Sequence, residues 1–209
     1  MSVLQQLKWR YATKSFDKDR LLSDNQIQTL KEAFNLTATS YGLQTLKLVV
    51  VTDKSLRQEL VKHAYNQAQV VDASHLLVIC VQNQIDASDV ESHFANLQRI
   101  RQTPDEVISP FKSHLTETIS QMPEDKKLSW AINQAYIALG NLMTVCAMEE
   151  IDSCPMEGFI TEAFDDELGL HEIGLKSVLL LPVGFRSETD FFSDLKKVRK
   201  DLSQTVIEM

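Results

Sequence analysis

The chain has 209 residues, 44% hydrophobic and 24% charged, a composition typical of a globular protein with a full core. Its formal net charge of −8 argues against nucleic-acid binding, which needs a basic face. We also expect no membrane span and no secretory signal, because no apolar run approaches the length of a span and the start lacks a charged and apolar leader. The three cysteines, without a CxxC pair, fit reduced thiols in a cytoplasmic protein.

The first half of the chain predicts two strands among helices. Val3, Leu4, Leu7 and Tyr11 fall at helical spacing and indicate a short opening helix. The strand over 75–81 is apolar on both faces, so we expect it at the centre of a sheet. The other predicted elements, in order, are a helix from Ser23 or Asp24, a polar loop over 37–45, a strand over 46–52, a helix from Ser55 and a short helical piece over 66–72.

The second half predicts longer helices and one more strand. Between residues 86 and 122, breaks at Thr103-Pro104 and Ser109-Pro110 suggest two helices, over 89–102 and 110–120, that form a mobile flank. The helix over 126–149 is apolar beyond one stripe, so it is either a buried spine or a dimer surface, and its Gln134 needs a partner. A helix over 161–168 and a strand over 177–183 complete the prediction, with no sign of a second domain.

Several familiar motifs are missing or broken. Gly174 and Lys176 stand near each other, but the segment precedes a strand where a phosphate loop must follow one. The six glycines contain no G-x-G-x-x-G, and there is no G-x-S-x-G. Glu167 and His171 alone are a poor metal site. The sequence therefore predicts no metal site, no Rossmann-type nicotinamide site and no hydrolase nucleophile of that kind.

The stretch 154–159, Cys-Pro-Met-Glu-Gly-Phe, is the first candidate for function. Pro155 fixes the backbone and Gly158 lets a flat ligand approach it, so we predict an exposed turn with the Glu157 N–H free to donate. The same residues also suit a plain connection between two elements. What favours a ligand site is a set of cations at both ends of the chain, Arg10, Lys14, Lys197 and Arg199, which would suit one phosphate dianion.

Together these pieces resemble the nitroreductase family of flavoenzymes, which use FMN and NAD(P)H. The likeness runs nearly end to end, and the order and separation of its parts carry it. Those parts are Arg10-Tyr-Ala-Thr-Lys14-Ser-Phe-Asp17, Thr39-Ser40 with Gln44, Asn66 before Asp72-Ala-Ser-His75, Gln134, Pro155-Met-Glu-Gly158-Phe and Lys197-x-Arg199.

The resemblance implies an α+β fold, a three-layer α/β/α sandwich with a mostly antiparallel central sheet, in which residues 1–209 form a single FMN-binding domain of a homodimer. Carried over residue by residue, it implies three groups around FMN. Arg10, Lys197 and Arg199 would grip the phosphate beside Tyr11 and Ala12, and Lys14 and Asn66 would face the pyrimidine edge near Gln69. Pro155, Met156, Glu157 and Gly158 would lie against the ring, and Thr39, Ser40, Gly42 and Gln134 would come from the other subunit.

Several positions depart from the family pattern. Ala12 stands where a Ser is usual, and Gln69 stands where a Lys or Arg often lies near the flavin N1–C2 carbonyl. The absence of that cation would lower the flavin potential unless Lys14 compensates. Gln44-Thr45-Leu46 replaces a common Gln-Pro-Trp, and Tyr41 and Gly42 alter the loop that shapes the substrate space.

The resemblance implies an enzyme that moves hydride from NADH or NADPH to flavin N5 and then, by a ping-pong mechanism, to a nitroaromatic or quinone. No side-chain acid or base is required. Three alternatives stay open: a flavin carrier or sensor without turnover, a dihydropteridine reductase or dehalogenase on the same scaffold, and a protein without cofactor.

Overall fold

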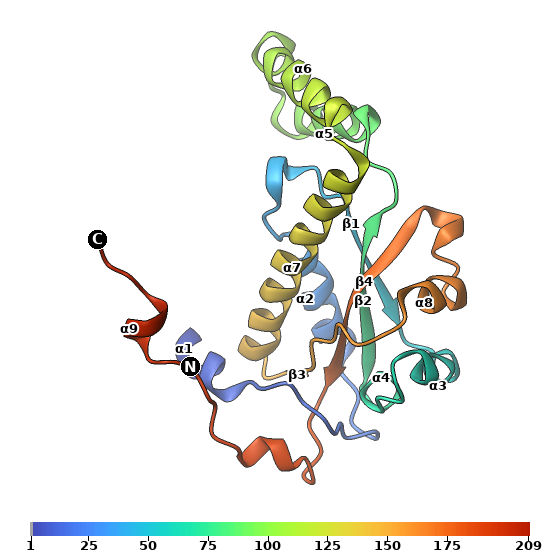
Figure 1. The fold of residues 1–209 in the computed structure, drawn as a ribbon, viewed down its shortest axis with the longest axis vertical. Helices are drawn as coiled ribbons and strands as arrows, with labels where there is room; N and C mark the ends of the chain where they lie inside the picture. Colours follow the sequence, from blue (N-terminus) through green and yellow to red (C-terminus); the bar gives the residue numbers. More distant parts are fainter. Residues whose placement is uncertain (1) are drawn as a thin grey trace.

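The computed structural model describes residues 2–209 and shows helices on both faces of a four-stranded sheet (Figure 1). The strands lie in the order β1-β2-β4-β3, and each neighbouring pair is antiparallel. Their bounds are β1 (Leu46–Val51), β2 (His75–Gln82), β3 (Asp152–Ser153) and β4 (Leu175–Gly184). The expected α+β fold, a three-layer α/β/α sandwich with an antiparallel sheet, is confirmed.

The central position of β2 follows from its sequence, as predicted. Residues 76–81 are all buried, because β2 is paired on both edges and covered on both faces. Leu77 and Ile79 belong to one hydrophobic core, whereas Val78 and Cys80 belong to the other. This alternation is the period of two that a strand imposes on its side chains. Burial raises the pKa of the Cys80 thiol to about 12, which fits its predicted place in the core.

Helices α2 (Asp24–Asn35) and α7 (Glu124–Met148) cover one face of the sheet, and α3 (Lys54–His63), α4 (Gln69–Asp72) and α8 (Thr161–Glu167) cover the other. Helices α5 (Ala87–Arg101) and α6 (Asp105–Gln121) project together beyond the end of the sheet (Figure 1). The short elements are α1 (Val3–Trp9), η1 (Ser40–Gly42), η2 (His171–Ile173), η3 (Phe191–Asp194) and α9 (Leu202–Thr205). Among residues 2–209, no helix is long and apolar enough to cross a membrane.

The predicted break at Ser109-Pro110 is wrong. Helix α6 begins at Asp105 and contains Pro110 near its start, where the missing N–H costs one helical hydrogen bond. Burial of Ile108, Leu115 and Ile119 along the same helix offsets that cost. The break at Thr103-Pro104 is confirmed, because α5 ends at Arg101 and the next residue, Gln102, has a left-handed φ of 53°.

Candidate functional site

A pocket of about 510 Å³ lies where the first segment of the chain meets the end of α7 and the C-terminal segment. We call it the basic pocket because six of its lining residues are Lys or Arg and none is Asp or Glu. They are Lys8, Trp9, Arg10, Tyr11, Ala12, Lys14, Met143, Pro155, Phe192, Ser193, Leu195, Lys196, Lys197, Val198 and Arg199. In a chain with a net charge of −8, such a local excess of cations favours an anionic ligand.

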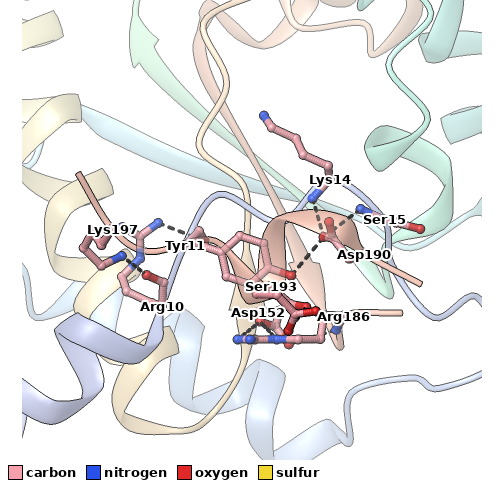
Figure 2. Close-up of polar contacts among 10 residues, drawn as sticks. Arg10, Tyr11, Lys14, Ser15, Asp152, Arg186, Asp190, Ser193 and Lys197 are labelled. Atoms are coloured by element: carbon pink, nitrogen blue, oxygen red, sulfur yellow. Dashed lines mark hydrogen bonds and ion pairs between the residues drawn. The ribbon is translucent and has the colours of Figure 1, made fainter. Parts of the chain in front are cut away.

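Arg10 is the half-buried member of this cluster, and it lies beside Lys197 (Figure 2). One guanidinium N–H donates to the Tyr11 carbonyl at 3.2 Å, but the buried Nε has no hydrogen-bond partner within residues 2–209. The Lys197 ammonium donates to the Arg10 carbonyl. Burial lowers the pKa of Arg10 and of Lys197, and the positive charge of Arg199 lowers both further. Because these charges repel one another without a carboxylate between them, a bound anion would stabilise the cluster.

Asp190 fixes the backbone beside these cations, and Figure 2 shows its contacts. The buried carboxylate accepts hydrogen bonds from the Tyr11 hydroxyl at 2.9 Å and from the N–H groups of Lys14 at 2.8 Å, Ser15 at 3.1 Å and Phe192 at 3.0 Å. Burial by itself would raise the pKa of Asp190, but these donors hold it below its ordinary value. The sequence prediction missed Asp190, and its only signal was an Asp ahead of the short helical turn η3.

A second anchor lies on the other side of Tyr11. Arg186 donates from Nε and from its backbone N–H to the Asp152 carboxylate, each at 2.8 Å, and its guanidinium stacks over the rings of Trp9 and Tyr11 at 4.3 and 4.6 Å. This pair joins the first segment of the chain to β3 and to the end of β4. The sequence prediction also missed both residues, since an isolated Asp and an isolated Arg carry no local signal.

The stretch 154–156 is extended and pairs with β4, so the predicted exposed turn is confined to the end of the segment, where the carbonyl of the exposed Glu157 accepts the Phe159 N–H at 3.0 Å. Met156 and Leu180 exchange both backbone hydrogen bonds, at 2.9 and 3.0 Å, so the segment continues β3 along β4. Cys154 and Met156 are buried, Pro155 and Gly158 are half-buried, and Glu157 alone is exposed. The sheet edge imposes this shape because the chain leaves β3 still paired with β4. The N–H groups of Cys154 and Met156 donate to β4, so Pro155 occupies the alternate position, where its missing N–H costs no hydrogen bond to that strand.

Lys14 and Gln69 meet this segment at Cys154. The Lys14 ammonium lies 3.7 Å from Cys154 Sγ, and the buried Gln69 side chain also hydrogen-bonds the thiol. Burial raises the pKa of Cys154 despite the nearby Lys14 charge, so the thiol stays neutral at pH 7. Two predicted site residues, far apart in the sequence, therefore lie beside the predicted ring-binding segment.

Glu157 and Gly158 present backbone groups next to a small loop. No hydrogen bond among the described residues is donated by the Glu157 N–H. The Glu157 carboxylate instead accepts from the Tyr136 hydroxyl at 2.7 Å. Gln67 donates to the Gly158 carbonyl at 2.8 Å, and Asn66 next to it is exposed with a left-handed φ of 60°.

Thr39, Ser40, Gly42 and Gln134 form a separate cluster, which we call the loop group. Within this chain the Ser40 N–H donates to Gln134 Oε1 at 2.9 Å, which supplies the partner predicted for Gln134. Among the residues that the structure describes, none of these four lines the basic pocket. Met143 on α7 does line the pocket. Gln134 lies nine residues before it, which is roughly 13 Å along the helix. One chain thus brings the predicted phosphate residues together but keeps the loop group apart from them.

Comparisons with known proteins agree on one family. The model of the nitroreductase family matches residues 7–185. A Staphylococcus aureus (strain USA300) protein, named as an inferred NAD(P)H nitroreductase, is 32% identical over 171 residues, covering 80% of this chain and 77% of its own. A Bacillus subtilis (strain 168) protein with the same kind of name is 32% identical over 198 residues, covering 88% of each chain.

Solved structures show the same fold. A nitroreductase-like protein from Streptococcus mutans superposes with a TM-score of 0.86 and 23% identity over 99% of this chain and 97% of its own. A protein from Exiguobacterium sibiricum, whose structure was solved in complex with FMN, superposes with a TM-score of 0.84 and 16% identity over 100% of this chain and 98% of its own.

Proposed function

This chain belongs to the nitroreductase family, and on that premise we propose that it is an FMN-dependent oxidoreductase that takes electrons from NADH or NADPH. Residues 1–209 form one FMN-binding domain in this proposal, and two copies form a homodimer with FMN at the interface. Relatives named as inferred NAD(P)H nitroreductases, and a fold neighbour solved with FMN, support the assignment. The single observation that carries it is the basic pocket, which collects six cations in an acidic protein.

The phosphate of FMN fits the residues of this pocket. Arg10 has an unpartnered buried Nε within residues 2–209, and a phosphate oxygen would give it an acceptor. Lys197 and Arg199 supply two further positive charges near Arg10, because the Lys197 ammonium donates to the Arg10 carbonyl and the charge of Arg199 lowers the pKa of Arg10. The pocket volume of about 510 Å³ falls within the range usual for cofactor and ligand sites.

The residues beside the pocket suit a planar ring system. Lys14 and Gln69 converge on Cys154 and would face the pyrimidine edge together with Asn66. Lys14 would carry the positive charge that favours a reduced, anionic ring, because Gln69 is neutral. The Glu157 N–H would serve as a backbone donor to the ring, and its side chain, held by Tyr136, would stay outside the chemistry.

A second copy of the chain would complete the site. The loop group lies too far along α7 to reach the basic pocket of its own chain. If α7 of one copy packs against α7 of another, the loop group of one copy would lie beside the basic pocket of the other. Tyr136 and Ile137 on α7 are 44% and 49% exposed, which leaves an apolar face for such a contact. The C-terminal segment adds exposed apolar residues, among them Val198, Leu202 and Ile207, and α9 lies away from the sheet (Figure 1).

The chain contributes binding and orientation rather than acid–base chemistry. When bound, FMN would supply the hydride chemistry, taking up a hydride from a nicotinamide at N5 and passing it to an electron-poor acceptor such as a nitroaromatic or a quinone. The cations would hold the phosphate, and the segment 155–158 would lie against one face of the ring. The nicotinamide and then the acceptor would bind in turn at the other face, which predicts ping-pong kinetics.

Two measurements test this proposal. The purified protein should be yellow, with the absorbance of oxidised flavin, and NADH or NADPH should bleach that absorbance under anaerobic conditions. A colourless protein that takes up no added FMN would contradict the cofactor assignment. A yellow protein that neither nucleotide bleaches would be a flavin carrier or sensor. Oxidising the reduced protein with a panel of nitroaromatics, quinones, dihydropteridines and halogenated phenols would then identify the acceptor class.

A further inference from the structure

We propose that Glu162, Asp165 and His171 form a binding site for a divalent transition-metal ion of the Zn²⁺ class. Glu162 and Asp165 lie on α8, and His171 lies on η2, four residues past the end of the helix. Each offers one ligand atom, a carboxylate oxygen or a ring nitrogen, and these atoms all lie within 4.8 Å of one another. None of the three is among the described residues that line the basic pocket, so the proposal is independent of the proposed function.

Asp165 is the residue that points to a cation. Its side chain is fully buried, with 0% exposure, and Oδ1 accepts the Ser177 N–H at 2.8 Å. The other oxygen, Oδ2, is buried without a hydrogen-bond partner in the part of the chain that the structure describes. A buried carboxylate oxygen without a partner is costly, and buried charges are usually paired or bound to metals. A metal ion at Oδ2 would remove that cost.

Glu162 and His171 can close around such an ion. Both side chains are exposed, and His171 Nε2 lies 3.9 Å from Glu162 Oε2. Zinc binds nitrogen and carboxylate oxygen at about 2.0–2.2 Å, so ligand atoms around it lie roughly 3.3 Å apart. A small rotation of the two exposed side chains would reach that spacing while the buried Asp165 stays fixed.

The donor set selects the class of ion. One imidazole nitrogen and two carboxylate oxygens suit Zn²⁺ and related transition metals, whereas Mg²⁺ and Ca²⁺ prefer ligand sets made of oxygen alone. Three protein ligands leave a fourth position for water. Bound there, the ion would join α8 to η2 directly, and to the start of β4 through the Ser177 contact with Asp165.

Lys176 competes with the ion and therefore provides a sharp test. Its ammonium lies 3.2 Å from Glu162 Oε1, so it holds one of the three ligands and places a positive charge nearby. Removing that charge with Lys176→Met should strengthen metal binding, because the Glu162 carboxylate becomes free and the repulsion disappears. A purely structural role for the cluster, with Lys176 as its cation, predicts no such gain.

The experiment is a calorimetric titration of ZnCl₂ into the full-length protein after dialysis against a chelator. We expect one Zn²⁺ per chain for wild type, at least tenfold weaker binding for His171→Ala, and severalfold tighter binding for Lys176→Met. His114→Ala removes an exposed histidine on α6, outside the cluster, and should bind like wild type. Circular dichroism confirms that each variant is folded.

Three results would overturn the proposal: no Zn²⁺ uptake by wild type, unchanged affinity in His171→Ala, or no gain in affinity in Lys176→Met. The flavin content of each preparation is recorded from its absorbance. Because the titration does not depend on FMN, failure of the metal site leaves the flavin proposal standing, and a colourless protein that binds Zn²⁺ leaves the metal site standing.

Discussion

The Tyr11 hydroxyl donates a 2.9 Å hydrogen bond to the Asp190 carboxylate across a sequence separation of 179 residues. Asp190 also accepts the N–H groups of Lys14 and Ser15. One carboxylate therefore fixes three residues of the N-terminal segment against the C-terminal segment. That attachment brings two cations to the same pocket: Arg10, next to Tyr11, and Lys197, on the segment that continues from Asp190.

Asp190→Asn tests this attachment. The amide keeps the shape of the side chain but turns charge-assisted hydrogen bonds into neutral ones and directs an NH₂ group at other donors. We expect the free energy of unfolding, measured by urea denaturation near pH 7, to fall by about 2–3 kcal/mol. The exposed Asp194→Asn, four residues away, is the matched control and should change it by less than about 0.5 kcal/mol.

The same variant predicts a pH dependence. The pKa of Asp190 in the folded protein lies below its ordinary value of 3.8. A lowered pKa of this kind contributes stability that is present above the unfolded pKa and is lost as the pH falls through the folded pKa. The stability gap between wild type and Asp190→Asn should therefore be full near pH 6 and shrink below about pH 4. A gap that stays constant to about pH 3 would disprove the role of the charge.

Arg10→Ala and Arg199→Ala test the phosphate assignment. Each removes one charged donor to the FMN phosphate, so affinity for FMN, measured by flavin fluorescence quenching, should fall by about 1.5–3 kcal/mol, or roughly 10- to 150-fold. Lys200→Ala is the matched control, because Lys200 follows Arg199 but is not among the described residues that line the basic pocket. Wild-type affinity in both arginine variants would refute the assignment.

Much of the fold could be predicted from the sequence because local patterns carried it. The β-branched run of β1 and the doubly apolar β2 predicted their strands, and β2 its central place. Pro110 was misread because burial along α6 outweighs one missing N–H, and no local rule weighs the two. The two-residue strand β3 was missed because it exists only through its pairing with β4.

The site divides in the same way. The cations of the basic pocket could be predicted because a family resemblance preserves their order, but Asp190, Asp152 and Arg186 act through contacts between distant segments. The sequence predicted no metal site, because Glu167 and His171 alone are a poor one and the fold brings His171, beyond the end of α8, to Glu162 and Asp165. The burial that makes Asp165 informative is visible only in the folded chain.

Glu157 allows the backbone and side-chain roles to be separated. Glu157→Ala removes the contact with Tyr136 but keeps the N–H, so FMN binding and most of the NAD(P)H oxidation rate should remain. Glu157→Pro removes the N–H, and it is compatible with the extended backbone of Met156 before it. We expect the proline variant to lose at least tenfold in anaerobic flavin reduction, measured by stopped flow. If the alanine variant released its flavin, the side chain would have a role that the proposal does not give it.

The division of the site between two chains can be tested by mixing defective subunits. Arg10→Ala removes a phosphate contact, and Gln134→Leu removes the acceptor that holds Ser40, so each variant alone should bind FMN weakly. If one site takes Arg10 from one chain and Gln134 from the other, a mixed dimer contains one site with both defects and one intact site. Equal amounts of the two variants, unfolded together and refolded, should recover about one quarter of the wild-type flavin sites, because about half of the dimers are mixed and each mixed dimer has one intact site of two.

Separate refolding of each variant is the control. If each chain instead built its whole site alone, mixing would recover no site at all, and the distance between the loop group and the basic pocket would need another explanation.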